Sequence, residues 1–280
     1  MRTDALPGLV AIVALTACAG ALASPHPSVR VALAQIRIED GDLEGNMRRA
    51  EEAIRQAARQ KADLICLAEA ADFGWLYQES RKVALPIPGR YSRLLCGLAK
   101  DLKVWISAGC LERDGETVYN SAVLINRRGK IILKHRKINT MPEATAHLYD
   151  AGKIDDITTA DTEFGRVGIT ICADNFDSKI PKRVADLGAW LLISPHGWAP
   201  RFGEFASSAQ SYQEHVRGLA QGNKLWVVAV DASMGRTHGG VWPDRFHIGC
   251  SMVANPKGEP MAIAKTLAPD LVIYQIPAEQ

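Results

Sequence analysis

Three residues that could carry out covalent catalysis stand where apolar segments of the chain end. Glu69 and Cys172 each close a strand-like segment, and Lys137 follows a third. The ends of strands are where α/β proteins build their sites. A cysteine supplies a nucleophile, a glutamate supplies a base, and a fixed ammonium group stabilises a tetrahedral oxyanion. Together the three predict nucleophilic catalysis through a tetrahedral intermediate.

Each of these residues also fits a purely structural interpretation. A buried thiol is the commonest fate of a cysteine, and a strand-end glutamate also fits a surface cap. Lys137 belongs to the basic run Lys134-His135-Arg136-Lys137, which is typical of a solvated surface. A helix is expected within a few residues of Cys172, and its N-terminal partial charge would favour the thiolate. The combination supports a site more strongly than any one residue does.

The composition is that of an ordinary globular protein and points to no nucleic acid, metal or cofactor. The chain has 280 residues, 47% of them hydrophobic and 23% charged, with a formal net charge of +2. A near-neutral charge gives no support to nucleic-acid binding, which requires a basic excess. The six cysteines include no CxxC and no Cys/His pair at zinc spacing. We therefore expect no nucleic-acid partner, no metal and no cofactor.

The N-terminal region reads as a targeting segment. Arg2 precedes the uncharged run 5–24, which has an apolar centre and small residues at its end, as secretory signals do. Two processing sites compete: Leu15-Thr16-Ala17-Cys18 resembles a lipobox that would place a lipid on Cys18, and Ala21-Leu22-Ala23 fits ordinary cleavage. An uncleaved membrane anchor is the third alternative. We expect residues 1–28 to direct export, giving a periplasmic protein or a membrane-anchored lipoprotein, and residues 29–280 to form the functional domain.

The body of the chain alternates strand and helix patterns. The residues Leu43, Met47, Ala50, Ile54 and Ala57 recur at spacings of three and four, which predicts a helix. By such patterns we expect helices at 43–60, 92–102, 180–187 and 204–223, and strands at 29–36, 64–67, 104–110, 118–125, 130–134, 158–162, 167–171, 190–194, 226–230, 250–255, 260–265 and 271–275. Helices interleaved with strands predict a layered α/β fold, and the hairpins predict mixed sheets.

In six ordered segments the chain resembles the nitrilase superfamily of carbon–nitrogen hydrolases. The segments are 31–35, 65–69, 135–138, 168–174, 217–223 and 249–258. The last two resemble the family's Arg-x-x-Ala-x-x-Asn helix and its Gly-x-Ser hairpin. Six segments in family order are far more specific than any single motif.

This resemblance implies a fold and a set of roles. The family fold is a four-layer αββα sandwich, and its members commonly assemble as homodimers or larger homo-oligomers. Glu69 would be the general base and acid, Lys137 would stabilise the oxyanion, and Cys172 would be the nucleophile. Glu143, six residues beyond Lys137, would be the second glutamate that the family often carries. Gly222 departs from the family pattern, because many members have a glutamate there.

The same resemblance implies a small-molecule substrate with a carbon–nitrogen bond. Ala173-Asp174 after the cysteine is closer to the Tyr-Asp of amidases than to the Trp-Glu of true nitrilases, which favours a small amide or N-carbamoyl compound over a nitrile. Residues that follow strand ends are candidates for the substrate pocket. They are Trp75, Asn175, Phe176, His196 and Trp198.

Two other functions stay open at this point. An acyltransferase would pass the thioester to an amine instead of water, as some members of the family do. A catalytically inactive secreted lipoprotein of the same fold would only bind its ligand, and the altered position Gly222 motivates this alternative. The retention of Glu69, Lys137 and Cys172 argues for an enzyme.

Overall fold

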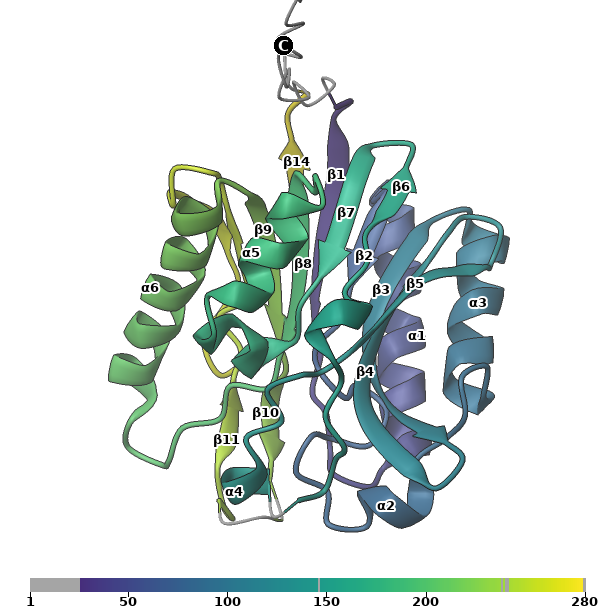
Figure 1. The fold of residues 1–280 in the computed structure, drawn as a ribbon, viewed down its shortest axis with the longest axis vertical. Helices are drawn as coiled ribbons and strands as arrows, with labels where there is room; N and C mark the ends of the chain where they lie inside the picture. The colour runs from purple at the N-terminus through teal and green to yellow at the C-terminus, as the bar shows by residue number, and fades with distance from the viewer. Residues whose placement is uncertain (1–25, 146, 238, 240–241, 279–280) are drawn as a thin grey trace, which may run out of the picture.

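Two six-stranded sheets form the centre of the molecule (Figure 1). The structure, a computed structural model, describes residues 26–145, 147–237, 239 and 242–278. The first sheet has the strand order β14-β1-β2-β3-β4-β5, and the second has the order β13-β12-β9-β8-β7-β6. Strands β1, β2 and β3 are parallel in the first sheet, as are β7, β8 and β9 in the second. The remaining neighbours pair antiparallel, so both sheets are mixed, as expected.

The first half of the chain builds most of the first sheet. Its strands are β1 (Val29–Gln35), β2 (Leu64–Cys66), β3 (Trp105–Asp114), β4 (Thr117–Ile125) and β5 (Ile131–Arg136), and β14 (Asp270–Ile276) joins them from the end of the chain. The crossover helices are α1 (Leu43–Arg59) and α3 (Arg90–Leu102), with the short α2 (Ser80–Val83) between β2 and α3. Asp42 directly precedes α1, and its carboxylate accepts the Gly45 N–H at 2.9 Å and so caps the helix.

The second half builds the second sheet. Its strands are β6 (Ala160–Thr162), β7 (Gly165–Ile169), β8 (Leu191–His196), β9 (Trp226–Asp231), β12 (Met252–Ala254) and β13 (Pro260–Ile263). The helices are α5 (Lys179–Asp186) and α6 (Phe205–Asn223), and a separate hairpin consists of β10 (Ser233–Arg236) and β11 (Phe246–Ile248). Short helical turns complete the chain: α4 (Pro142–Thr145) and two 3₁₀ turns at Ile154–Asp156 and Cys172–Phe176.

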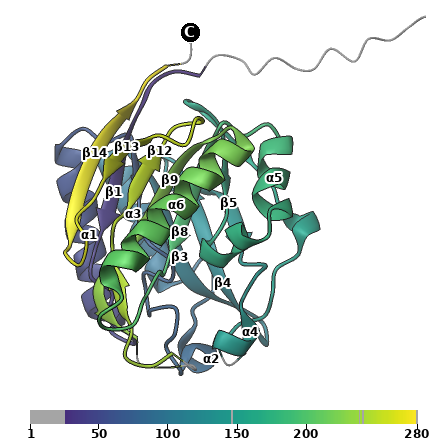
Figure 2. The ribbon, with the colours of Figure 1, turned by 90° about the vertical axis from the view of Figure 1, so that its left-hand side faces the viewer.

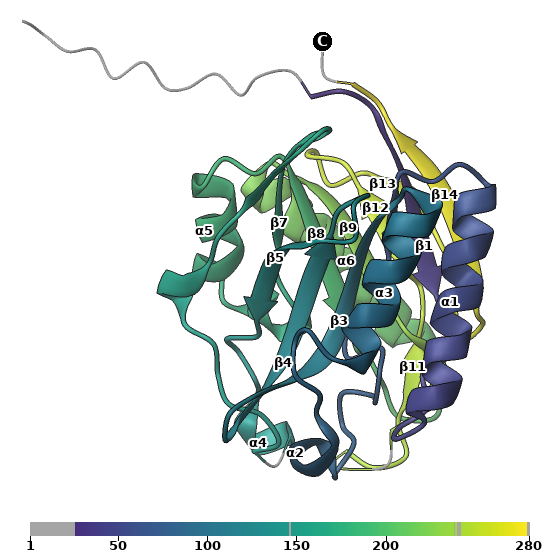
Figure 3. The ribbon, with the colours of Figure 1, turned by 90° about the vertical axis from the view of Figure 1, so that its right-hand side faces the viewer.

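The two sheets pack face to face between two helical layers. Figure 2 shows α5 and α6 on one side, and Figure 3 shows α1 and α3 on the other. α1 contacts β1, α3 contacts β3, and α6 contacts β9, while β1 of the first sheet contacts β9 of the second. This is a four-layer αββα sandwich, which confirms the predicted fold class.

The alternation of side chains along the central strands explains why both faces of each sheet are covered. On β8, Leu191 and Ile193 lie in the cluster that joins the two sheets, whereas Leu192 lies in the cluster under α6. Strand β9 divides in the same way, with Val228 in the first cluster and Val227 in the second. A strand buried on both faces in this way requires an apolar layer on each side.

The strands and helices expected from the pattern are all present, with ends shifted by a few residues. Patterning did not predict the short turns α2 and α4, nor the hairpin β10–β11. These elements are three or four residues long, too short for a periodicity to show.

The predicted targeting segment falls largely on residues 1–25, which lie outside the described part of the chain. Cys18 and both candidate processing sites are within it. Among the described residues, no helix combines the length and the apolar character needed to cross a membrane.

Candidate active site

Glu69 stands just beyond the carboxyl end of β2, where the two sheets face each other. Its backbone N–H donates to the His196 carbonyl of the second sheet at 3.2 Å. A Cβ on Gly109 of β3 would lie 2.6 Å from the Glu69 Cα, so only glycine permits this close approach. The Glu69 backbone is therefore held in place by backbone from both sheets.

The two carboxylate oxygens of Glu69 are in different situations. Oε1 accepts from Lys137 Nζ at 2.5 Å and from Asn120 Nδ2 at 2.6 Å. Oε2 is buried and has no hydrogen-bond partner among the described residues. Buried carboxylate oxygens are rarely left in this state, and an exception at a strand end points to a function. One oxygen thus holds the group in place, and the other is free to exchange a proton.

Lys137 is buried directly beside this carboxylate. Its backbone N–H donates to the Asn120 carbonyl at 2.8 Å, which continues the pairing of β4 and β5 by one residue. Its Nζ lies 5.7 Å from the centre of the Trp75 ring. Burial is the largest single effect and would lower the pKa of Lys137, but the charge and hydrogen bond of Glu69, together with its other acidic neighbours, raise that pKa above its usual value. The ammonium therefore stays charged inside the protein.

Asp174 connects the lysine loop to the cysteine turn. Its Oδ1 accepts the backbone N–H groups of Ile138 and Asn139, both at 2.8 Å. Its Oδ2 accepts from His135 Nε2 at 2.8 Å and from the Ile171 N–H at 2.9 Å. Burial would raise the pKa of Asp174, but these donors, His135 first, hold it below its usual value. A single carboxylate therefore sets the distance between the segments that carry Lys137 and Cys172.

Cys172 lies on a sharp turn after β7. Its φ is +44°, a left-handed conformation that is uncommon for residues other than glycine. Burial raises the pKa of the thiol, and the charge of Glu69 raises it further, while Lys137 and the Gly197 N–H act in the opposite direction. The sulfur is therefore a thiol at neutral pH. It can act as a nucleophile only if a base removes its proton during the reaction.

A pocket of about 270 Å³ opens over Cys172. Its lining is mainly apolar and includes four aromatic side chains, with Glu204 and Arg245 as its charged side chains. Its lining residues are Trp75, Met141, Cys172, Phe176, Gly197, Trp198, Ala199, Pro200, Glu204, Ser208, Trp242 and Arg245. The volume suits a small molecule whose carbon skeleton packs against aromatic rings.

Three of the predicted pocket residues line this pocket and two do not. Trp75, Phe176 and Trp198 line it, as expected. The Asn175 side chain is instead held between Thr170 Oγ1 at 2.6 Å and Ser194 Oγ at 2.8 Å. The His196 ring is fully buried, with its Nε2 2.9 Å from Ser194 Oγ. Both side chains therefore contact Ser194, and neither of them lines the pocket over Cys172.

Glu143 is not brought to the other candidates. It lies in the short turn α4, its side chain is exposed, and it does not line the pocket over Cys172. Its placement six residues from Lys137 in sequence did not determine its distance in space. Nothing in its described surroundings assigns it a catalytic contact.

The sequence analysis did not single out Asn120, nor three of the residues that line the pocket over Cys172. A buried asparagine in the middle of an apolar strand is unusual, and this signal could have singled out Asn120. Met141, Trp242 and Arg245 come from loops far along the chain. No periodicity relates them to Cys172.

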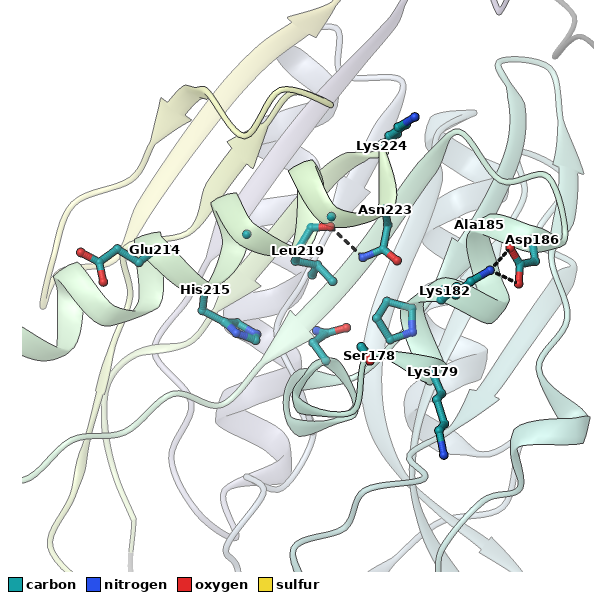
Figure 4. Close-up of a pocket in the computed structure, with 14 residues that line it drawn as sticks. Ser178, Lys179, Lys182, Ala185, Asp186, Glu214, His215, Leu219, Asn223 and Lys224 are labelled. Carbon is teal, nitrogen blue, oxygen red and sulfur yellow. Dashed lines mark hydrogen bonds and ion pairs between the residues drawn. The ribbon is translucent and has the colours of Figure 1, made fainter.

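A larger hollow of about 830 Å³ lies elsewhere, between α5 and α6 (Figure 4). It is lined by charged and polar side chains such as Lys179, Glu214 and Lys224, and none of the three candidate catalytic residues lines it. Size alone therefore does not identify the site. Among the described residues, no group of three or more His, Cys, Asp or Glu side chains could hold a metal ion.

A cysteine, a buried glutamate and a buried lysine, gathered where two mixed sheets meet, define an enzyme class that attacks carbon–nitrogen bonds with a thiol. The comparison with known families agrees. The family model described as carbon-nitrogen hydrolase matches residues 30–280, so the chain belongs to this family, which is the nitrilase superfamily.

Curated relatives are similar in sequence, and solved structures have the same fold. The chain is 29% identical over 252 residues to a nitrilase of Pyrococcus abyssi, covering 89% of each chain. It is 28% identical over 255 residues to the omega-amidase NIT2 of Homo sapiens, covering 85% of each. The fold matches Nit3 of Saccharomyces cerevisiae with a TM-score of 0.76, 23% identity and 90% coverage of both chains. It also matches an amidase of Nesterenkonia sp. AN1 with acrylamide added at its active-site cysteine, at a TM-score of 0.78, 18% identity and coverage of 89% and 93%.

Proposed function

We propose that this carbon–nitrogen hydrolase cleaves a small amide, with Cys172 as nucleophile, Glu69 as general base and acid, and Lys137 as the cation that stabilises the oxyanion. The observation that carries the proposal is the state of the Glu69 carboxylate. Its Oε1 is held by Lys137 and Asn120, and its Oε2 is buried without a partner in the described structure. Such a carboxylate is positioned and ready to take a proton.

In the first step, the Cys172 sulfur attacks the amide carbon. Because the pKa of the thiol is raised by burial, its proton must leave as the S–C bond forms, and Glu69 accepts it. The electron pair of the C=O bond moves to oxygen. Lys137 and backbone N–H groups beside Cys172 stabilise the negative charge on that oxygen.

In the second step, the tetrahedral intermediate collapses. Glu69 returns the proton to the leaving nitrogen, the C–N bond breaks, and an acyl thioester remains on Cys172. A water molecule then attacks the thioester and gives a proton to Glu69, and the sulfur leaves. The sulfur regains this proton, so the acid product departs and the enzyme returns to its starting state.

Two features support an amide in preference to a nitrile. The pair Ala173-Asp174 after the cysteine resembles the Tyr-Asp of amidases more than the Trp-Glu of true nitrilases. The relatives include proteins named omega-amidase as well as one named nitrilase. An N-carbamoyl compound presents the same C(=O)–N group and belongs to the same proposal.

Ammonia release from a panel of small amides, N-carbamoyl compounds and nitriles tests this function. We expect amide turnover by the wild-type protein, a loss of at least about 10³-fold for Cys172→Ala, and a folded but stalled enzyme for Glu69→Gln. Amide hydrolysis at the wild-type rate by Cys172→Ala would refute the mechanism. Transfer of the acyl group to an added amine in preference to water would assign an acyltransferase instead.

We further propose that the protein is exported and forms a homodimer or larger oligomer. The uncharged run at 5–24 supports export, either through lipidation of Cys18 or through cleavage after Ala23. Labelling of the expressed full chain with a palmitate analogue, compared with Cys18→Ser, separates these two routes. Light scattering of the purified protein measures the number of subunits.

A further inference from the structure

Asp231 and His247 form a buried ionisable pair that the proposed mechanism does not use. Asp231 ends β9 and His247 lies in the middle of β11, and their side chains are 0% and 1% exposed. His247 Nδ1 lies 3.9 Å from Asp231 Oδ1, which is within ion-pair distance but too long for a hydrogen bond. Neither ring nitrogen of His247 has a hydrogen-bond partner among the described residues. A buried polar group in this state requires an explanation.

The carboxylate of Asp231 connects two segments of the chain beside the pocket over Cys172. Its Oδ1 accepts the Trp198 N–H at 2.8 Å, and its Oδ2 accepts the Gly249 N–H at 3.1 Å. The Ile248 N–H in turn donates to the Trp198 carbonyl at 3.1 Å. Both backbone polar groups of Trp198, a lining residue of the pocket, are thereby fixed, one by the carboxylate and the other by β11.

The loop that the carboxylate holds also reaches the sulfur of the nucleophile. Gly197 directly precedes Trp198, and its N–H is a hydrogen-bond donor to the Cys172 thiol. A Cβ on Gly197 would lie 2.5 Å from the Trp75 ring, so this part of the loop packs tightly against another ring of the pocket. A shift of the Trp198 amide would therefore move both the donor at the sulfur and the lining of the pocket.

The charge on Asp231 decides how well it can hold the loop. Protonation turns one carboxylate oxygen into a donor, so only the ionised group accepts both N–H groups fully. Burial raises the pKa of Asp231, while His247 and the two N–H groups act in the opposite direction. Within the part of the chain that the structure describes, no lysine or arginine lies within ion-pair distance of Asp231. Tyr212 of α6 and Cys172 also face it, but burial above all, and the charge of Asp231 in addition, raises the pKa of both groups, so neither supplies a positive charge.

We propose that Asp231 and His247 are positioning residues for the reaction at Cys172. His247 keeps the Asp231 carboxylate ionised, and the ionised carboxylate holds the segment 197–198 at the sulfur and at the pocket. The pair acts through the backbone of this loop, because neither side chain lines the pocket. The inference rests on the proposed amide hydrolysis for its activity assay and adds two residues to the site.

The pH profile of amide hydrolysis tests the pair in the full-length protein. His247→Leu replaces the ring with an apolar side chain of similar size and removes no hydrogen bond found in the described structure. We expect its kcat/KM to be about tenfold lower at pH 6 than at pH 9, beyond any change in the wild type, because Asp231 is protonated at the lower pH. Asp231→Asn should lose about tenfold at both pH values. Adding His247→Leu to Asp231→Asn should then change kcat/KM by less than about threefold.

His215→Leu is the matched control. The His215 ring also packs against Trp198, with 5.7 Å between the ring centres, and its Nε2 likewise has no hydrogen-bond partner in the described structure. Burial lowers the pKa of His215 without a contribution from a carboxylate. This variant should therefore keep the shape of the wild-type pH profile. A His247→Leu profile of wild-type shape, or a full second loss in the double variant, would overturn the inference.

Urea unfolding provides a measurement that needs no turnover. Because burial raises the pKa of Asp231, its ionisation opposes folding, and this loss of stability should extend to higher pH in His247→Leu than in the wild type. The urea midpoint of each protein is compared with that of its Asp231→Asn counterpart. Between pH 5 and pH 9 this difference should fall further for His247→Leu than for the wild type, and equal changes would overturn the inference. If Cys172→Ala still hydrolysed amides, the proposed function would fail, and the unfolding comparison would still decide whether His247 acts on Asp231.

Discussion

Replacement of Asn120 by alanine tests whether catalysis depends on how Glu69 is held. Asn120 Nδ2 donates to Glu69 Oε1 at 2.6 Å, and both side chains are buried. Asn120 does not line the pocket, so it has no contact with substrate to lose. Its removal should disturb the orientation of the proton-carrying carboxylate and leave the binding surface intact.

The size of the effect follows from the kind of hydrogen bond that is lost. A hydrogen bond to a charged group contributes about 1.5–3 kcal/mol. Because about 1.4 kcal/mol corresponds to a factor of ten in rate, kcat should fall by about 10- to 150-fold. KM should change by less than about threefold, since the residues that bind the substrate before the reaction are not affected.

The assay is ammonia release at saturating and limiting amide, with urea unfolding of each variant as the measure of stability. Ser121→Ala is the matched control, because Ser121 is the next residue of β4 and faces the opposite side of the sheet. Its Oγ donates to the buried carboxylate of Glu112 at 2.6 Å, so this variant also loses a buried hydrogen bond to a carboxylate. Both variants should lose about 1–3 kcal/mol of unfolding free energy, and only Asn120→Ala should lose kcat.

Two results would contradict this reasoning. An Asn120→Ala enzyme with wild-type kcat would mean that Lys137 alone positions the carboxylate. Equal losses of kcat in both variants would mean that activity follows stability and not the contact with Glu69.

Three further predictions concern the surroundings of the site. Lys137→Met should lower the unfolding free energy by about 3–5 kcal/mol in urea titrations, because it leaves the Glu69 carboxylate buried without its cation. The same variant should slow the alkylation of Cys172 by iodoacetamide, because Lys137 lowers the pKa of that thiol. Burial raises the pKa of Asp72 from 3.8 to about 7, so the unfolding free energy of the wild type falls as the pH rises from 4 to 8. Over this range the unfolding free energy of Asp72→Asn should increase by about 4 kcal/mol relative to the wild type. A difference between the two proteins that does not change with pH would refute this. Gly109→Ala should destabilise the fold by about 1–3 kcal/mol in urea unfolding and reduce kcat in the ammonia assay, because the added Cβ would press on the Glu69 backbone. Unchanged values would show that the strand can shift to make room.

The sequence predicted the strands and long helices because both faces of the central strands are buried and the helices keep a clear apolar period. It also placed Glu69, Lys137 and Cys172 at strand ends, and the structure brings these three together. It did not predict that Glu143 is exposed on α4, nor that the Asn175 and His196 side chains contact Ser194 and do not line the pocket. The sequence position of a residue after a strand end does not show in which direction the chain turns next. That direction decides which side chains reach a pocket.

The position of the two sheets relative to each other cannot be predicted from the strand pattern, although the site depends on it. Glu69 and Lys137 follow strands of the first sheet, while Cys172 follows a strand of the second. Apolar packing between sheets is not directional, so it cannot by itself set the distance from the sulfur to the carboxylate. Hydrogen bonds across the interface do so: the Glu69 N–H donates to the His196 carbonyl, and Asp174 accepts from Ile138 and Asn139.

A second polar connection runs beneath the pocket and explains two conspicuous segments of the sequence. Gln35, at the end of the first strand, accepts the Ser251 N–H at 2.9 Å and the Ser251 hydroxyl at 2.8 Å. The Ser251 oxygen in turn accepts the Asp231 N–H at 3.0 Å, and the Asp231 carboxylate accepts the Trp198 N–H at 2.8 Å. The chain of contacts thus begins in the first sheet and ends at a wall of the pocket over Cys172. The Gly-x-Ser hairpin and the opening strand therefore belong to the positioning of the site as much as Asp174 does, because they fix one sheet against the other at the end where Cys172 and Glu69 meet.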